Sequence, residues 1–113
     1  MINQNSGHII NISSEAAGNP EGLTLYGVGD AALERFTNGL ALEVKNNNIF
    51  VNSLDPGRVK TEGALYTYPP DTDWLGWKNP EDVVPSAIYL ATLGNNDFTG
   101  RSVLTDEFGK NWP

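Results

Sequence analysis

Three runs of mostly apolar residues recur along the chain, and their composition predicts the strands of a sheet. The runs cover residues 8–12, 49–54 and 98–105. The first two are rich in Ile, Val and Phe and show little alternation of apolar and polar residues, which is typical of strands buried on both faces of a parallel sheet. Gly100 interrupts the third run, which we still expect to form a strand.

Between the first two runs, apolar residues return every three or four positions and predict a helix. We expect it over residues 26–45, with one buried face. That face would consist of Ala32, Leu33, Phe36, Leu40, Ala41 and Val44. Three asparagines follow at 46–48, and asparagine tolerates the left-handed conformation in which helices often end.

A second helix is expected from residue 80 to Gly94. Asn79, Pro80 and Asp82 have the residue types that favour a helix N-terminus, namely an N-cap, a proline in the first turn and an acid facing the helix dipole. Residues 15–25 and 58–78 show neither a helical nor a strand period, so we expect irregular loops there.

The order strand, helix, strand, helix, strand predicts an α/β fold. Right-handed crossovers give a partial Rossmann-like, doubly wound parallel sheet of three strands, with one helix on each face. The chain of 113 residues is long enough for one such partial domain, 1–113, and too short for two. Because the outer edge of the first strand would be bare, we expect a partner to cover it, either another copy in a homo-oligomer or a complementary chain.

Composition narrows the classes of partner. Fourteen acidic and seven basic residues give a net charge of −7, which disfavours nucleic acid and anionic membrane surfaces. The sequence contains no cysteine, no apolar stretch of roughly 18 residues and no signal-peptide pattern. These features predict a cytoplasmic protein whose partners include neither nucleic acid nor membrane.

Several motifs occur in a characteristic order and spacing. They are residues 6–14, Tyr26 with residues 31–33, residues 49–52 and residues 56–61. Together they closely resemble the C-terminal half of the short-chain dehydrogenase/reductase domain. The resemblance implies an NAD(P)-dependent oxidoreductase that transfers a hydride between the nicotinamide cofactor and a small alcohol or carbonyl substrate. The half of that domain which normally brings the Gly-rich phosphate loop has no counterpart here, and no glycine stretch matches a G-x-G-x-x-G turn.

The resemblance assigns catalytic roles to two residues. Tyr26 would be the general acid or base, and Ser14 would hold the substrate oxygen. Ser14 matches by its place after the Asn-Ile-Ser run, whereas Ser13 has the more usual separation from Tyr26, so both serines remain candidates.

Asp30 departs from the family pattern. The resemblance places a lysine four residues after the tyrosine, where it would lower the proton affinity of the phenol and bind the nicotinamide ribose. Residues four apart on a helix lie on the same face, so Asp30 puts an anion where a cation is expected. An anion disfavours the ionised phenol that a cation would favour. Gly27 and Gly29 also weaken the helix start, and we expect a slow or inactive catalytic centre.

The cofactor contacts implied by the resemblance follow the second strand. There Pro56, Gly57, Val59 and Thr61 match the turn that meets the nicotinamide of NAD or NADP. Ligands of such sheets bind outside the carboxyl ends of the strands, where this turn would lie.

A long aromatic segment at about 58–79 matches the substrate lid of the family. Trp74 or Trp77 would cover an apolar substrate, but both tryptophans would serve equally well as a core plug or an oligomer contact. Asp71 and Asp73 belong to a solvated loop and predict no metal site. A second class of function stays open, in which the chain is a non-catalytic remnant that serves oligomerisation or protein binding.

Overall fold

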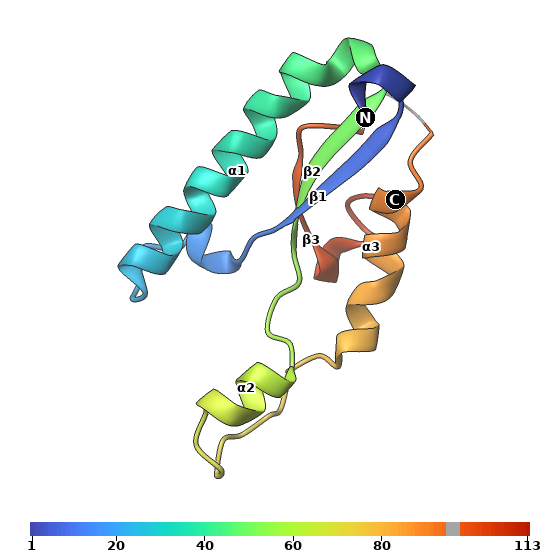
Figure 1. Cartoon of the computed structure of the whole chain (residues 1–113). Helices are drawn as coiled ribbons and strands as arrows, with labels where there is room; N and C mark the ends of the chain where they lie inside the picture. The colour runs from blue at the N-terminus through green and yellow to red at the C-terminus, as the bar shows by residue number, and fades with distance from the viewer. Residues whose placement is uncertain (95–97) are drawn as a thin grey trace.

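The three predicted strands form one parallel sheet. The structure is a computed structural model that describes residues 1–94 and 98–113. The strands β1 (Gly7–Ile12), β2 (Ile49–Asp55) and β3 (Ser102–Leu104) pair in the order β1-β2-β3, all parallel (Figure 1). The helix α1 (Thr24–Val44) joins β1 to β2, and α3 (Val84–Ala91) lies between β2 and β3. The predicted α/β fold with a partial Rossmann-like parallel sheet is therefore confirmed.

Two apolar clusters cover the central strand, one on each face. On one face, side chains of β2 and α3 pack with C-terminal aromatics, and the cluster contains Phe50, Leu54, Leu90, Leu93, Phe98, Val103 and Trp112. On the other face, β2 packs against α1, and the cluster contains Ala41, Val44, Ile49 and Val51. All seven residues of β2 are buried, and the helices lie on opposite faces of the sheet as predicted.

The prediction that β1 is buried on both faces is wrong. Residues 7–11 are only half-buried, and Ile12 is 56% exposed. Among the described strands β1 pairs with β2 alone, so one row of its backbone groups has no strand beside it. The bare outer edge that the sequence predicted is present, and a row of unpaired strand groups is a template for another chain.

The first helix starts earlier than predicted and buries only part of the expected face: Ala41 and Val44 are buried, whereas Ala32 and Phe36 are exposed. It begins at Thr24, after Leu23 in a left-handed conformation with φ 46°. Phe36 is 56% exposed, whereas Thr37 is fully buried. The polar Thr37 fits there because its hydroxyl accepts a hydrogen bond from Asn11 and donates one to the carbonyl oxygen of Leu33. Asn48 has φ 50°, which confirms the left-handed residue expected after this helix.

The segment expected to be an irregular loop contains a short helix. Helix α2 spans Glu62–Thr67, and the side chain of Thr61 caps it by accepting a hydrogen bond from the Ala64 N–H at 3.1 Å. A bridge between Val59 and Lys78 closes the base of the excursion. In Figure 1 α2 stands away from the sheet, which helps to explain a longest dimension of 50 Å.

The C-terminal part also departs from the prediction in detail. The third strand covers only Ser102–Leu104, because residues 105–107 turn into a 3-10 helix. The second helix starts with a 3-10 turn, Pro80–Val83, whose first turn is fixed by a hydrogen bond from the Asn79 N–H to the Asp82 carboxylate at 2.8 Å. Within residues 1–94 and 98–113, the helices are too short or too polar to cross a bilayer.

Candidate functional site

The carboxyl ends of β1 and β2 lie at one edge of the sheet and hold the candidate site. Because the strands are parallel, Ser13 and Ser14 after β1 come close to Asp55 at the end of β2. A pocket of about 460 Å³ opens there. Its lining includes Ser14, Tyr26, Asp55, Gly57, Arg58 and Trp77. The structure thus brings four of the residues singled out from the sequence, Ser14, Tyr26, Gly57 and Trp77, to one cavity.

Ser14 and Asp30 form a direct hydrogen bond. The Ser14 hydroxyl donates to Oδ2 of Asp30 at 2.5 Å, and Ser14 Oγ accepts the Ala16 N–H at 3.2 Å. Asp30 lies one helical turn beyond Tyr26 on α1, so both residues are on the same side of the helix. The only donor hydrogen of the Ser14 side chain is therefore directed at Asp30.

Ser13 faces a different neighbour. Its side chain is 4% exposed, and its hydroxyl donates to Oε1 of Glu34 at 2.7 Å. Ser14 contributes to the pocket that Tyr26 also lines, whereas Ser13 does not. Of the two serines, Ser14 is therefore the one at the described pocket.

Gly27 allows the first turn after β1 to approach α1. That turn is the 3-10 helix Glu15–Ala17, with Ser14 at its start. A Cβ atom on Gly27 would lie 2.5 Å from the carbonyl oxygen of Ala16, whereas a Cβ atom on Gly29 would meet nothing within 4 Å. The sequence suggested only that both glycines weaken the helix. The structure adds a packing reason for Gly27, which keeps Ser14 within reach of Asp30.

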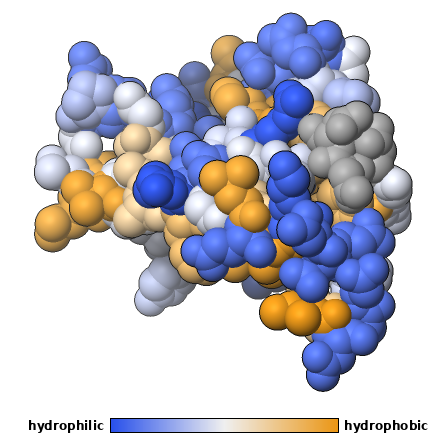
Figure 2. Space-filling model, turned by 90° about the horizontal axis from the view of Figure 1, so that it is seen from above, coloured by the Kyte–Doolittle hydropathy of each residue, from blue (hydrophilic) through white to orange (hydrophobic). Residues whose placement is uncertain are grey.

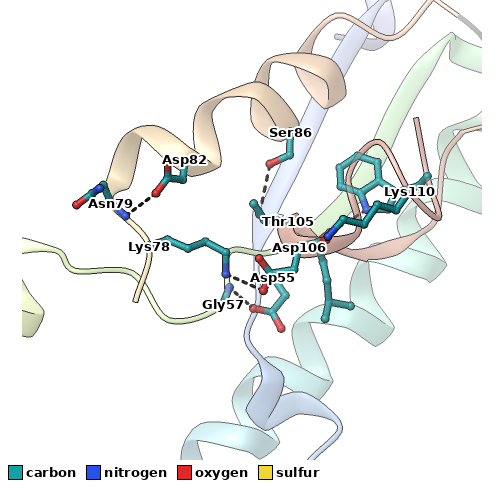
Figure 3. Close-up of polar contacts among 11 residues, drawn as sticks. Asp55, Gly57, Lys78, Asn79, Asp82, Ser86, Thr105, Asp106 and Lys110 are labelled. Carbon is teal, nitrogen blue, oxygen red and sulfur yellow. Dashed lines mark hydrogen bonds and ion pairs between the residues drawn. The ribbon is translucent and has the colours of Figure 1, made fainter. Parts of the chain in front are cut away.

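Asp55 closes β2 and fixes the turn that follows. Its Oδ1 accepts the Gly57 N–H at 2.7 Å, and beside it Lys78 pairs with Asp106 at 2.8 Å (Figure 3). Burial raises the pKa of the Asp55 carboxyl above its ordinary value of 3.8. The negative charges of Glu15 and Glu34 add to this rise, while the Gly57 N–H and Lys78 oppose it.

Asp55 was not singled out from the sequence. The signal that could have identified it is its position at the carboxyl end of a buried parallel strand, where ligands of such sheets bind. Arg58 and Tyr68 also line the pocket and were missed. Both fall in a segment without periodicity, so the sequence carried no signal for their direction.

The turn residues predicted to meet a cofactor separate into two groups. Gly57, with φ 69°, lines the pocket. Pro56, Val59 and Thr61 do not belong to the described lining. Instead, Val59 forms the bridge to Lys78, and its carbonyl oxygen accepts the Thr61 N–H at 2.9 Å. These residues shape the base of the 58–78 excursion beside the pocket.

The aromatic residues of this excursion pack on one another. Ring centroids lie 5.1 Å apart for Tyr68 and Trp77, and 4.9 Å apart for Trp74 and Trp77. Trp77 and Tyr68 line the pocket, while Trp74 supports them and carries the Lys60 ammonium 5.5 Å above its ring. Of the two predicted lid tryptophans, Trp77 is the one that meets the cavity.

Known proteins resemble the chain over most of its length. Residues 1–69 match the family model of the short chain dehydrogenases. An uncharacterised oxidoreductase of Staphylococcus saprophyticus is 39% identical over 92 residues, which cover 79% of this chain and 37% of that protein. The 5-keto-D-gluconate 5-reductase of Escherichia coli K12 is 28% identical over 116 residues, which cover 94% of this chain and 46% of that protein. The chain thus spans less than half the length of these relatives.

Solved structures agree with the sequence matches. A Beutenbergia cavernae protein with bound NADP, assigned as an NAD(P)-dependent gluconate 5-dehydrogenase, superposes with a TM-score of 0.81 at 25% identity, covering 93% of this chain and 46% of that one. A gluconate 5-dehydrogenase of Burkholderia cenocepacia in complex with NADP and tartrate gives a TM-score of 0.78 at 26% identity, covering 91% and 44%. The fold, the order of the motifs and the family model lead to one conclusion: the chain belongs to the short-chain dehydrogenase family.

Proposed function

We propose that the chain is the C-terminal half of an NAD(P)-dependent oxidoreductase acting on a small alcohol or carbonyl compound. The observation that carries this proposal is the single pocket shared by Ser14, Tyr26 and the turn after β2. Tyr26 would exchange a proton with the substrate oxygen, and Ser14 would contact the same oxygen. Both groups come from separate elements and converge only in the folded chain.

A complementary N-terminal half is the partner that this function requires. The open edge of β1 supports such a partner, because a parallel strand placed there would extend the sheet. The matched relatives, of which this chain covers 37% and 46%, are long enough to contain that missing half. The arrangement would also cover the half-exposed side chains of β1.

The cofactor would be NAD or NADP, and its nicotinamide end would lie by the turn after β2. Gly57 supports this placement because it lines the pocket directly after β2. Pro56, Val59 and Thr61 would hold the shape of the same turn without lining the pocket. The cofactor supplies or accepts the hydride, whereas the protein residues orient the substrate and move its proton.

Asp30 is expected to impair proton transfer at this centre. It binds the hydrogen of Ser14, which a carbonyl substrate would otherwise receive. It also stands where the family has a lysine that binds the nicotinamide ribose, and a carboxylate does not replace that cation. The chain would therefore work slowly even with its missing half.

The proposal is tested by restoring the missing half. The chain would be produced together with the segment of the Staphylococcus saprophyticus oxidoreductase that precedes the matched region, and NAD(P)H turnover would be followed by absorbance. We expect Asp30→Lys to raise the rate at least about tenfold, equivalent to about 1.4 kcal/mol of barrier. Glu43→Lys is the control, because it makes the same charge change on an exposed part of α1 outside the pocket. A complex that forms but shows no gain with Asp30→Lys contradicts a latent enzyme.

A non-catalytic interaction module is the second candidate. It is favoured by the exposed apolar side chains of α1, with Leu25 88%, Val28 62% and Phe36 56% exposed. Hydrophobic residues also reach the surface among hydrophilic ones on the face seen in Figure 2. Light scattering tests this candidate: an oligomer that Phe36→Glu dissociates supports it, and a monomer at all concentrations contradicts it.

A further inference from the structure

We infer that Lys78 is a positioning residue for the pocket, because it fixes the wall that the 58–78 excursion contributes. Its backbone closes the base of the excursion, and its ammonium ties that base to the segment after β3. The inference goes beyond the proposed function, since it concerns how the pocket is held in shape and stands whatever ligand the pocket takes.

The backbone of Lys78 holds two residues of the pocket lining in place. Its N–H donates to the carbonyl oxygen of Arg58 at 2.9 Å, and its carbonyl oxygen accepts the Lys60 N–H at 2.8 Å. These two hydrogen bonds flank Val59, which forms the bridge to Lys78. Arg58 and Trp77, which lie next to this bridge in the sequence, both line the pocket. The position of Lys78 therefore decides where two lining residues lie.

The side chain of Lys78 crosses the turn after β2 and reaches a third segment. Its ammonium pairs with Oδ2 of Asp106 at 2.8 Å, in the 3-10 helix that follows β3 (Figure 3). A Cβ atom on Gly57 would lie 2.5 Å from Lys78 Nζ, so the missing side chain of Gly57 leaves this path open. One lysine thus joins the end of β2, the excursion and the segment after β3.

The excursion depends on this base for its direction. In Figure 1 α2 stands away from the sheet, and the two ends of the excursion meet at the bridge between Val59 and Lys78. The tie to Asp106 is modest, because the Lys78 side chain is 17% exposed and that of Asp106 is 64% exposed. Ion pairs open to solvent contribute little and are screened by salt. Loss of the pair should therefore shift opening of the excursion by up to about fivefold while the sheet stays folded.

Hydrogen exchange of single amides tests the inference on the 113-residue chain. The Lys60 N–H reports opening of the excursion, and the N–H of the buried Ala41 in α1 reports unfolding of the sheet layer. In Lys78→Met we expect the Lys60 amide to exchange up to about fivefold faster, with Ala41 unchanged. Lys78→Arg keeps the charge and should keep the wild-type rates. Lys45→Met removes the same charge at an exposed position after α1 and is the control.

Salt gives a readout that a merely structural role would not move. Added NaCl should speed exchange of the Lys60 amide in the wild type and in Lys45→Met, but not in Lys78→Met, which has no pair left to screen. Asp106→Asn removes the same pair at an exposed residue, and the double variant with Lys78→Met should exchange no faster than either single variant. Equal acceleration of the Lys60 and Ala41 amides, or a salt effect that persists in Lys78→Met, overturns the inference.

Fluorine NMR of the chain labelled with fluorotryptophan follows the pocket wall itself. The Trp77 resonance should shift in Lys78→Met and in Asp106→Asn, and it should return to its wild-type position in Lys78→Arg. The resonance of Trp112, which is buried in the core, should stay in place and so confirms that the chain is folded. A Trp77 resonance that does not respond to loss of the ion pair overturns the inference. These readouts need neither cofactor nor turnover, so they are independent of the proposed function.

Discussion

The close approach of the 3-10 helix Glu15–Ala17 to α1 predicts that Gly27 and Gly29 respond in opposite ways to the same substitution. In Gly27→Ala the new methyl group would lie 2.5 Å from the carbonyl oxygen of Ala16, a backbone atom that cannot swing aside. In Gly29→Ala the methyl group would meet nothing within 4 Å. The two sites lie in the same helix, two residues apart.

The magnitudes follow from two opposing effects. Alanine in place of glycine inside a helix stabilises by about 1 kcal/mol through backbone entropy. Overpacking against a fixed neighbour costs about 1–3 kcal/mol. Gly29→Ala should therefore raise the free energy of unfolding by about 0.5–1 kcal/mol. Gly27→Ala should gain nothing or lose up to about 2 kcal/mol, because the clash offsets the entropy.

Urea unfolding followed by tryptophan fluorescence and circular dichroism measures both variants under the same conditions. Comparing the two alanine variants with each other removes the common effect of helix propensity. The expected difference between them is about 1–3 kcal/mol. Equal stabilisation by both substitutions would refute the close contact between Gly27 and Ala16, and with it the positioning of Ser14 beside Asp30.

Further predictions concern the turn after β2. Because burial makes the Asp55 carboxyl bind its proton more tightly in the folded chain, stability falls as the pH rises from 3.8 through the native pKa. The Asp55→Asn variant should therefore have a higher free energy of unfolding than the wild type at neutral pH, and this difference should vanish below pH 3.8. Denaturant titrations that give the same difference in unfolding free energy at every pH would contradict this prediction. Gly57→Ala should destabilise by about 1–3 kcal/mol, since Gly57 has φ 69° and a Cβ atom would lie 2.5 Å from Lys78 Nζ. Gly76 also has a positive φ, but a Cβ atom there would meet nothing within 4 Å. If Gly76→Ala lowers the melting temperature as much as Gly57→Ala does, contact with Lys78 adds nothing to the destabilisation.

The fold could be predicted because apolar periodicity and helix caps depend on residues that are close together in the sequence. The continuous apolar run of β2 and the cap signals around Asn79 need no knowledge of the rest of the chain, and both elements occur where expected. Burial could not be predicted in the same way. Phe36 has the spacing of a core residue, yet it is exposed because the side of α1 that faces β2 includes Thr37 instead.

Part of the pocket lining was singled out from the sequence, but its contacts were not. Ser14, Tyr26 and Trp77 line one pocket, together with Asp55, Arg58 and Tyr68, which the sequence did not indicate. The Ser14–Asp30 hydrogen bond joins a strand end to a helix through the tertiary fold, and spacing alone does not encode it. The role of Gly27 likewise depends on the position of Ala16, which is set by packing rather than by helix propensity.

The most direct test of the account is the effect of NAD(H) and NADP(H) on the melting temperature of the chain, alone and with the complementary N-terminal half. A ligand at a hundred times its Kd adds about 2.7 kcal/mol of stability. We expect a clear rise for the complex with one of the two cofactors, and only a small rise for the chain alone. A well-formed complex whose melting temperature no nicotinamide cofactor changes would contradict the claim that this chain carries half of a hydride-transfer site.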